Sequence, residues 1–220
     1  MKKLEYKSSK WEKRKSILIE NSKYDYDEVS TLTKLYHEQK MDEIRFRYTL
    51  SICYKNIAED AFVQNDYLGC YENIEKSLNE FVTSVRLLNE GKSTNQATIL
   101  NINNKISSGY FGYLALLTSN YDAVSQIVEP NSTIIQILSN DVIAEDENDN
   151  IRAMECAISK KDSDQFQSAL VERIKKIRKL NLDNYICADF VTMALMKEAK
   201  KAGMQFCSEY VEVDMKNINV

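Results

Sequence analysis

The sequence contains little glycine, proline or histidine. Its 220 residues include five Gly, one Pro and one His. Glycine and proline punctuate all-β chains and long irregular loops, so their scarcity favours long helices. His37 is the only histidine that a Ser/His/Asp or Cys/His mechanism could use, and no nucleophile stands in a recognisable motif. We therefore predict that the chain is not an enzyme and that His37 is exposed to solvent.

The cysteines lack the spacing of two common frameworks. They are five in number and form no CxxC pair, which supports neither a disulfide scaffold nor a structural zinc site. Adjacent acids such as Asp146 and Glu147 have the chemistry for metal binding or acid–base catalysis, but they belong to a polar run typical of a solvated loop. The sequence predicts reduced thiols, no catalytic residues, no metal and no cofactor.

Long hydrophobic runs are also missing. The apolar run YFGYLALL at 110–117 is far shorter than the roughly 20 residues that cross a bilayer. Near the N-terminus only ILI at 17–19 is continuously apolar, which is shorter than the apolar region of a secretory signal. We expect no membrane span, no export and a cytoplasmic location.

Charge is unevenly distributed along the chain. The segment 1–23 carries eight Lys/Arg against three Glu, a net charge of +5. Because the whole chain carries −4, the remaining residues carry −9. An acidic body disfavours nucleic acid as a direct ligand and favours a basic partner.

Apolar residues recur at helical spacing through most of the chain. Ile99, Ile102, Ile106, Tyr110 and Leu114 predict one helix over 95–118 with a single buried face. Other helices are predicted at about 27–39, 43–63, 66–90, 121–128, 149–160, 163–179 and 184–202.

Two segments alternate apolar and polar residues, as strands do. IRFRYTLSI at 44–52 has this pattern, but it runs directly into the helical pattern YKNIAEDAF, which favours a helix. SEYVEVDM at 208–215 is either a short strand or an extended arm.

Three short segments predict the turns of helical hairpins: QNDYLGCY, TSNYDAV and KKDSDQFQ. Each places a capping side chain at the start of a helix, followed by an aromatic (Tyr67, Tyr121, Phe166) that can pack back on the preceding helix. Asp162 with Gln165 makes a capping box. The aromatics are 54 and 45 residues apart, so no regular repeat is indicated. We predict an all-α fold, an irregular array of antiparallel helical hairpins.

We predict a single helical domain over 1–220 with a basic segment at 1–23. The best linker candidate is 139–150, a polar run with the acids Asp141, Glu145, Asp146, Glu147 and Asp149. A second charged stretch, VERIKKIRK at 171–179, has the bases of a phosphate site. On a helix, however, its isoleucines face inward and the bases spread over a solvated face.

The C-terminal half resembles the all-helical immunity proteins of bacterial polymorphic toxin systems, in particular the immunity protein 49 family. The likeness lies in IRAMECAISKKDSDQFQSALVERIKKIRK, with its KKD turn, and in the helix DFVTMALMKEAKKAG. SGYFGYLALLTSNYDAV also looks like a middle hairpin of that family. Residues 1 to about 40 show no such likeness.

The resemblance implies a cytosolic protein that binds a cognate toxin domain tightly and blocks it. Toxins of these systems are often nucleases with basic active sites, which an acidic body would complement. Our hypothesis is that the acids at 141, 145, 146, 147 and 149 lie at or near the toxin-facing surface. A solvated loop without a partner is the competing interpretation. A helical-repeat adaptor that binds a peptide or helix is the second candidate function, and a small helical enzyme the third.

Overall fold

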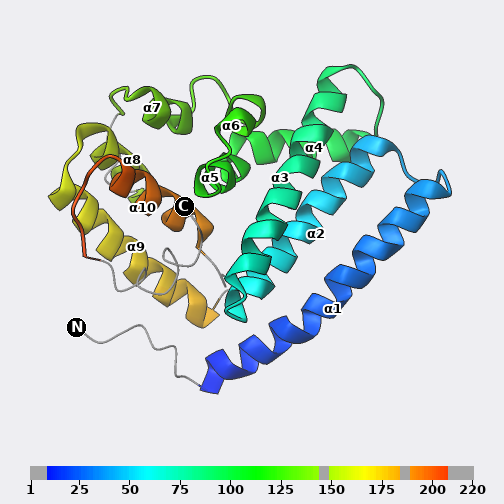
Figure 1. Ribbon diagram of the computed structural model, residues 1–220, viewed down its shortest axis with the longest axis horizontal. Coiled ribbons are helices and arrows are strands. Elements are labelled where there is room, and N and C mark those ends of the chain that lie inside the picture. Colours follow the sequence, from blue (N-terminus) through cyan, green and yellow to red (C-terminus); the bar gives the residue numbers. More distant parts are fainter. Residues whose placement is uncertain (1–8, 144–148, 184–188, 208–220) are drawn as a thin grey trace. The chain divides into compact units, whose positions relative to one another are not determined.

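The computed structural model describes residues 9–143, 149–183 and 189–207. Within these ranges there are ten α-helices and no β-strand (Figure 1). The helices are α1 (Ser9–His37), α2 (Glu43–Val63), α3 (Tyr67–Asn89), α4 (Gln96–Ser107), α5 (Tyr110–Leu117), α6 (Tyr121–Ile127), α7 (Thr133–Ser139), α8 (Asn150–Lys160), α9 (Ser163–Asp183) and α10 (Phe190–Lys201). The predicted all-α fold is confirmed, whereas the possible strand at 208–215 lies outside the described residues.

The helices belong to two compact units. The N-terminal unit lies within Glu5–Phe111 and the C-terminal unit within Gly112–Val220, so the division falls inside α5. The predicted linker at 139–150 lies within the C-terminal unit, where it joins α7 to α8. The single domain over 1–220 stays a prediction, because two compact units can share one fold.

In the N-terminal unit, α2 and α3 are antiparallel and pack side by side (Figure 1). The hydroxyl of Ser77 in α3 donates a hydrogen bond to the backbone oxygen of Ser51 in α2 at 2.6 Å. This contact shows that the two backbones come within reach of one short side chain. At the start of α5, Phe111 stacks on Phe81 of α3 with their ring centroids 3.8 Å apart. In this core, small side chains let α2 and α3 approach closely, and aromatic side chains pack α5 against α3.

Helix α1 packs along α2 through a separate apolar cluster. Leu32 of α1 is buried with Phe46, Leu50 and Cys53 of α2. Tyr36 lies flat on Phe46, with their ring centroids 4.3 Å apart. The segment 44–52, whose pattern matched both helix and strand, is helical, and Asp42 caps it by accepting the N–H of Arg45 at 2.9 Å.

The predicted helix over 95–118 is wrong as a single element. The chain forms α4 and α5, with a turn between them at Gly109, whose φ is +66°. Glycine adopts this left-handed conformation without steric cost, so it can redirect the chain while the apolar spacing continues on both sides. The apolar spacing therefore concealed the turn, since it fits two short helices as well as one long helix.

Three other helices differ from the predictions. α10 begins at Phe190 and not near residue 184, and residues 184–188 lie outside the described residues. α1 begins at Ser9 and not near residue 27, because the polar stretch before Asp27 contains no Pro or Gly to stop a helix. α7 was not predicted, because its seven residues are too few to show a period. Ser132 caps α7 by accepting the N–H of Ile135 at 3.4 Å.

In the C-terminal unit, α10 is buried on nearly all sides. Every residue from 192 to 199 is buried, including the polar Thr192, Lys197 and Glu198. A helix that is buried all round normally carries apolar side chains alone. Each of these three polar side chains must therefore find a partner inside the protein.

Three of the helix–helix turns share one local geometry. In each, the residue before the N-cap has a positive φ: Asn65 (63°), Ser119 (59°) and Lys161 (54°). In the α8–α9 turn, the N–H of Asp162 donates to the carbonyl oxygen of Ala157 at 2.9 Å. The Asp162 carboxylate accepts the N–H of Gln165 at 2.9 Å, as predicted for a cap. The predicted packing of the aromatic against the preceding helix is confirmed at Tyr67, whose ring meets the ring of Phe62 edge-on at 5.9 Å.

Adjacent substitutions in the α8–α9 turn should change stability in opposite directions. Lys161→Gly should raise the free energy of unfolding by about 0.5–1 kcal/mol, because glycine adopts positive φ freely. Asp162→Ala should lower it by about 1 kcal/mol, because the N–H of Gln165 loses its acceptor. Urea unfolding would measure both values. Equal signs for the two substitutions would contradict this account of the turn.

Candidate functional site

The predicted acidic run is described only at its ends. Asp141 is exposed and follows α7, whereas Glu145, Asp146 and Glu147 lie outside the described residues. Asp149 caps α8: its Oδ1 accepts the N–H of Ile151 at 2.9 Å and that of Arg152 at 3.4 Å. One of the five acids therefore has a structural role. That the run binds a partner stays a prediction.

Residues next to Asp141 anchor this run to the C-terminal unit. Ile143 is buried, and its N–H donates to the hydroxyl of Ser159 in α8 at 3.3 Å. Val142, by contrast, is 83% exposed. The segment after α7 is thus held at Ile143, and it presents Asp141 and Val142 to solvent.

The most buried cation among the described residues lies against the turn between α5 and α6. The ammonium group of Lys197, from α10, donates to the carbonyl oxygen of Leu117 at 2.7 Å and to the hydroxyl of Ser119 at 2.6 Å. Lys197 is 3% exposed, and burial lowers its pKa. The last carbonyls of a helix carry partial negative charge, so a cation is stabilised at this position.

A serine hydroxyl 2.6 Å from a lysine amine also occurs in nucleophilic Ser–Lys pairs. Here the same amine donates to the Leu117 carbonyl at the end of α5. An ammonium group, which has three protons, satisfies both acceptors at once. The arrangement is therefore that of a buried lysine capping a helix.

Tyr121, the aromatic of the same turn, connects two more polar residues of α10. Its hydroxyl donates to Glu198 at 3.1 Å and accepts from the ammonium group of Lys201 at 2.6 Å. The Lys201 ammonium also lies 4.2 Å from the centre of the Tyr121 ring. These contacts raise the pKa of Lys201, chiefly through the hydrogen bond with Tyr121. The aromatic of this turn thus packs against α10 with both its ring and its hydroxyl.

A second buried polar group lies between α5, α7 and α8. Glu155 is 2% exposed, and its Oε1 accepts the hydroxyls of Tyr113 at 2.5 Å and Thr133 at 2.7 Å. Its other carboxylate oxygen lies 3.6 Å from the Arg152 guanidinium. Burial raises the pKa of Glu155, and burial together with this carboxylate raises that of Tyr113. A single carboxyl therefore connects three helices.

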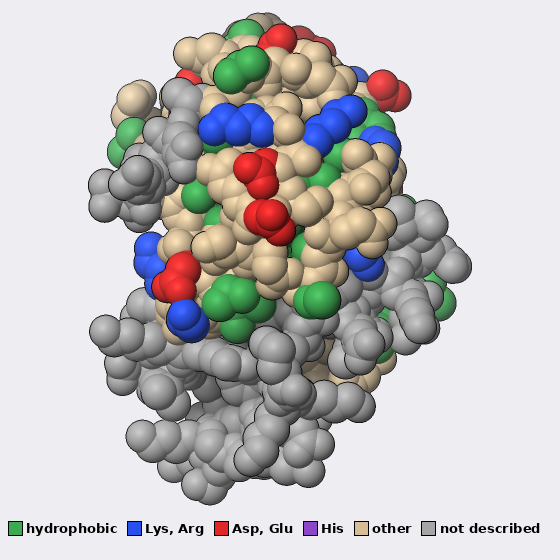
Figure 2. Space-filling model, turned by 90° about the vertical axis from the view of Figure 1, so that its left-hand side faces the viewer, with side chains coloured by type: hydrophobic (Ala, Val, Ile, Leu, Met, Phe, Trp, Pro, Cys, Tyr) green, Lys and Arg blue, Asp and Glu red, His purple; other side chains and the backbone are tan. Residues whose placement is uncertain are grey.

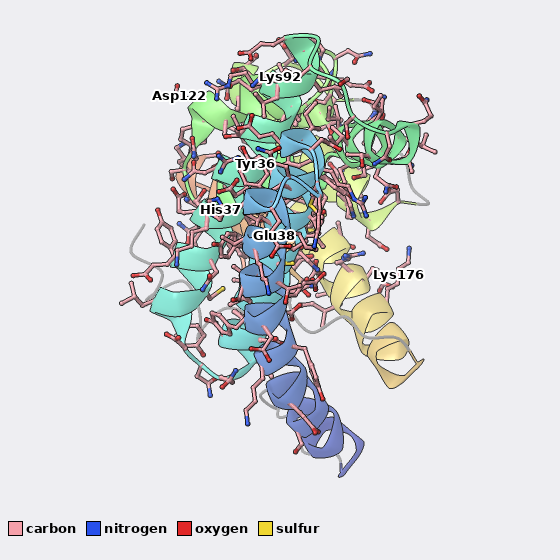
Figure 3. The ribbon with its side chains drawn as sticks, turned by 90° about the vertical axis from the view of Figure 1, so that its right-hand side faces the viewer. Tyr36, His37, Glu38, Lys92, Asp122 and Lys176 are labelled. Carbon is pink, nitrogen blue, oxygen red and sulfur yellow. The ribbon has the colours of Figure 1, made fainter. Side chains whose placement is uncertain are left out.

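The basic stretch of α9 is divided between two roles. Arg173 makes two hydrogen bonds, each of 3.2 Å, to the two carboxylate oxygens of Asp189, the N-cap of α10. Asp189 also accepts from the hydroxyl and the N–H of Thr192. Lys175 is exposed and pairs with Glu172 at 2.6 Å, while Lys176 is exposed (Figure 3). The prediction of a solvated face holds for these lysines and is wrong for Arg173, which is engaged between helices.

The left-hand face of Figure 1, shown in Figure 2, carries charges of both signs. Acidic side chains lie between groups of Lys and Arg, with hydrophobic side chains scattered among them. Among the described residues of this face, no extended region of one charge is visible.

In the N-terminal unit, carboxyl groups of α1 and α2 lie close to one another. Asp60 of α2 is 5% exposed, and its Oδ2 has no hydrogen-bond partner. Burial raises its pKa from the ordinary 3.8 to about 7, with further contributions from Asp25 of α1 and Glu59. Burial and the nearby Glu28 raise the pKa of Asp25 as well, although Asn56 donates to it at 3.4 Å.

His37 lies at the end of α1, beside Tyr36 and Glu38 (Figure 3). It is exposed, as predicted. With Tyr36, Met41 and Asp42 it lines an open concavity of about 550 Å³ at the turn to α2. Within the described residues, no group of three or more His, Cys, Asp or Glu is placed to hold a metal ion.

Sequence reasoning missed Asp60, Lys197 and the pairing of Arg173. A polar residue on the apolar face of a helix was the available signal: Lys197 follows the apolar stretch of α10, and Asp60 lies one turn after Ile57. Their partners could not be read from the chain, because Lys197 and Ser119 are 78 positions apart.

Comparisons of the chain with protein-family models, with proteins of curated function and with solved structures found no match. Of the helices in the described ranges, none combines the length and the apolar character that crossing a membrane requires.

Replacing Arg173 should destabilise the protein far more than replacing a neighbouring base. Arg173→Ala should lower the free energy of unfolding by about 3 kcal/mol, because it leaves the buried Asp189 carboxylate without its cation. Lys175→Ala, two residues away on the exposed face, should change it by less than about 0.5 kcal/mol. Chemical denaturation of both variants measures the difference. Similar losses would show that the Arg173–Asp189 pair is no stronger than a surface pair.

Asp60→Asn should stabilise the protein at alkaline pH. A pKa raised on folding means that the folded state holds the proton more tightly than the unfolded state. The free energy of unfolding is therefore not reduced by Asp60 below about pH 4, and it falls as the pH rises through about 7. At pH 8 the variant should exceed the wild type by about 2–4 kcal/mol, at 1.36 kcal/mol per pKa unit.

Near pH 4 the Asp60→Asn variant and the wild type should be equally stable. Denaturant unfolding at pH 4, 6 and 8 tests this, with the exposed Asp27→Asn as control. A constant difference between variant and wild type across these pH values would refute it.

Proposed function

We propose that the chain is an immunity protein that binds a cognate toxin domain in the cytosol and neutralises it. The toxin is a nuclease or another toxin that acts in the cytosol. The chain itself contributes no chemistry: inhibition results from occupying the toxin's surface.

The observation that carries the proposal is the hairpin built from α8 and α9, together with α10. These helices contain the sequence that resembles immunity protein 49, and the α5–α6 hairpin contains the further segment of likeness. The segments that carry the likeness also contain residues with structural roles: Asp162 begins α9, and Lys197 and Glu198 hold α10 to the α5–α6 turn.

The distribution of charge supports a protein partner of opposite sign. The chain carries −9 outside residues 1–23. A negative surface accelerates association with a basic toxin and repels nucleic acid, the substrate of a nuclease toxin. Tight, specific inhibition needs such complementarity in addition to buried area.

Capture of the partner from the native cell tests the proposal. The tagged chain is washed at about 0.5 M salt, which removes partners held by charge alone, and the retained proteins are identified by mass spectrometry. We expect one stoichiometric protein that ends in a toxin domain.

The captured domain is then expressed with and without the chain. Cell death without the chain and growth with it would support neutralisation. Several substoichiometric partners, none of them toxic, would instead favour the helical-repeat adaptor.

A further inference from the structure

The exposed face of α4 carries no charged side chain. A solvent-exposed helix face normally carries several charges, and that of α3 includes Glu72, Lys76 and Arg86. The one charged residue of α4, Lys105, is half-buried. The exposed residues of α4 are all neutral: Gln96, Ala97, Leu100, Asn101, Asn103, Asn104 and Ser107.

Leu100 lies in the middle of this face and is 57% exposed. Ala97 and Asn104, three residues before it and four after it, lie on the same side of the helix. We name Ala97, Leu100, Asn101 and Asn104 the α4 neutral face. Among the exposed large hydrophobic residues of the described ranges, Leu100 alone has no charged residue within four positions along the chain. These residues are Tyr24, Tyr26, Leu68, Leu100 and Val142.

The opposite side of α4 fixes the helix in the N-terminal unit. Thr98 and Ile102 are buried, and α4 contacts α2. Asn95 caps the helix, because its side chain accepts the N–H of Thr98 at 2.9 Å. The neutral face is therefore presented by a helix that is held from behind, and substitutions on this face should leave the fold intact.

The chemistry of the α4 neutral face is self-complementary. A carboxamide both donates and accepts hydrogen bonds, so an asparagine can pair with the same residue of a second copy. Among the described residues, the side chains of Asn101 and Asn104 have no hydrogen-bond partner. Leu100 can likewise pack against its own equivalent. A charged face cannot pair with itself in this way, because like charges repel each other.

The charge of the whole chain also favours this face for a contact between copies. Each copy carries −4, with −9 outside residues 1–23, so two copies repel each other. The repulsion costs least where neither surface carries charge. An asparagine at the seam between two helices can also fix their register.

We propose that the α4 neutral face is a contact between two copies of this chain, related by a two-fold axis. In such a contact the same patch serves both copies, which requires the self-complementary chemistry described above. The 12 residues of α4 span about 18 Å, so the interface is small and the dimer is a reversible one. This inference does not depend on the proposed function, which concerns a different partner.

Two leucine substitutions test the contact. Leu100→Glu places a carboxylate in the α4 neutral face. Leu68→Glu is the matched control, because Leu68 is an exposed leucine of the same unit with Asp66 and Glu72 nearby in the chain. Asn104→Leu is a third variant that should act in the opposite direction, and circular dichroism checks that all three are folded.

Sedimentation equilibrium of the full chain over about 0.01–1 mM gives the dissociation constant of the dimer. We expect Leu100→Glu to raise this constant at least 10-fold, because two carboxylates then meet at the contact. Leu68→Glu should change it less than 2-fold. Asn104→Leu should lower it at least 5-fold, because apolar side chains replace the amides in the seam.

The salt dependence separates this contact from one made by ion pairs. Raising the salt from about 0.05 to 0.5 M should leave the dissociation constant unchanged or lower it, because salt screens the repulsion between acidic copies. A dimer that dissociates as the salt rises would be held by opposite charges and would overturn the inference.

Other outcomes also decide the matter. A wild type that stays monomeric up to about 1 mM, or a dimer that Leu100→Glu leaves unchanged, would overturn the contact. If no dimer forms and Leu100→Glu instead abolishes binding of the captured toxin, the face belongs to the toxin. That result would overturn this inference and leave the immunity function standing. A dimer with the expected order of variants, in a cell that yields no toxin, would leave the contact standing without the immunity function.

Discussion

The C-terminal unit depends on the ammonium group of Lys197. It lies inside the protein on a helix that is buried over eight consecutive residues, and it is satisfied by the end of α5 and by the Ser119 hydroxyl. The neighbouring Glu198 is satisfied through Tyr121, and Arg173 binds the N-cap of α10 from α9. α10 is thus fixed at both ends by charged groups, while apolar side chains fill the space between them. A charged group in an interior without water needs a hydrogen-bond or ion-pair partner at a fixed position. This requirement sets the position of α10 along its neighbouring helices.

Local chemistry made much of the fold predictable from sequence. Capping residues such as Asp66 and Asp162, followed by apolar residues at helical spacing, located the starts of α3 and α9 correctly. The turn at Gly109 was missed because a periodic pattern does not change when a helix breaks and resumes. α1 was predicted too short because its first half carries few apolar residues, and a helix without breakers continues regardless.

The polar contacts between helices were not predictable in the same way. Lys197, Arg173 and Asp60 look like ordinary helix residues in the sequence. The fold brings a carbonyl to Lys197 and a carboxylate to Arg173, and it leaves Oδ2 of Asp60 without a hydrogen-bond partner. These contacts depend on residues that are distant in the chain. The acidic run at 141–149 is the opposite case. Its charge led to the prediction that all five acids bind a partner, whereas Asp149 caps α8.

The position of α10 in the chain has a consequence for synthesis. It is the last helix of the described residues, yet it contacts α5, α6, α8 and α9. A ribosome releases the N-terminal unit first, and that unit contains its own α2–α3 core. The C-terminal unit must wait with its apolar surfaces uncovered until α10 emerges. Apolar surface that is exposed during synthesis is prone to aggregation. A stop codon before residue 190 would leave the N-terminal unit with its α2–α3 core and the C-terminal unit without α10.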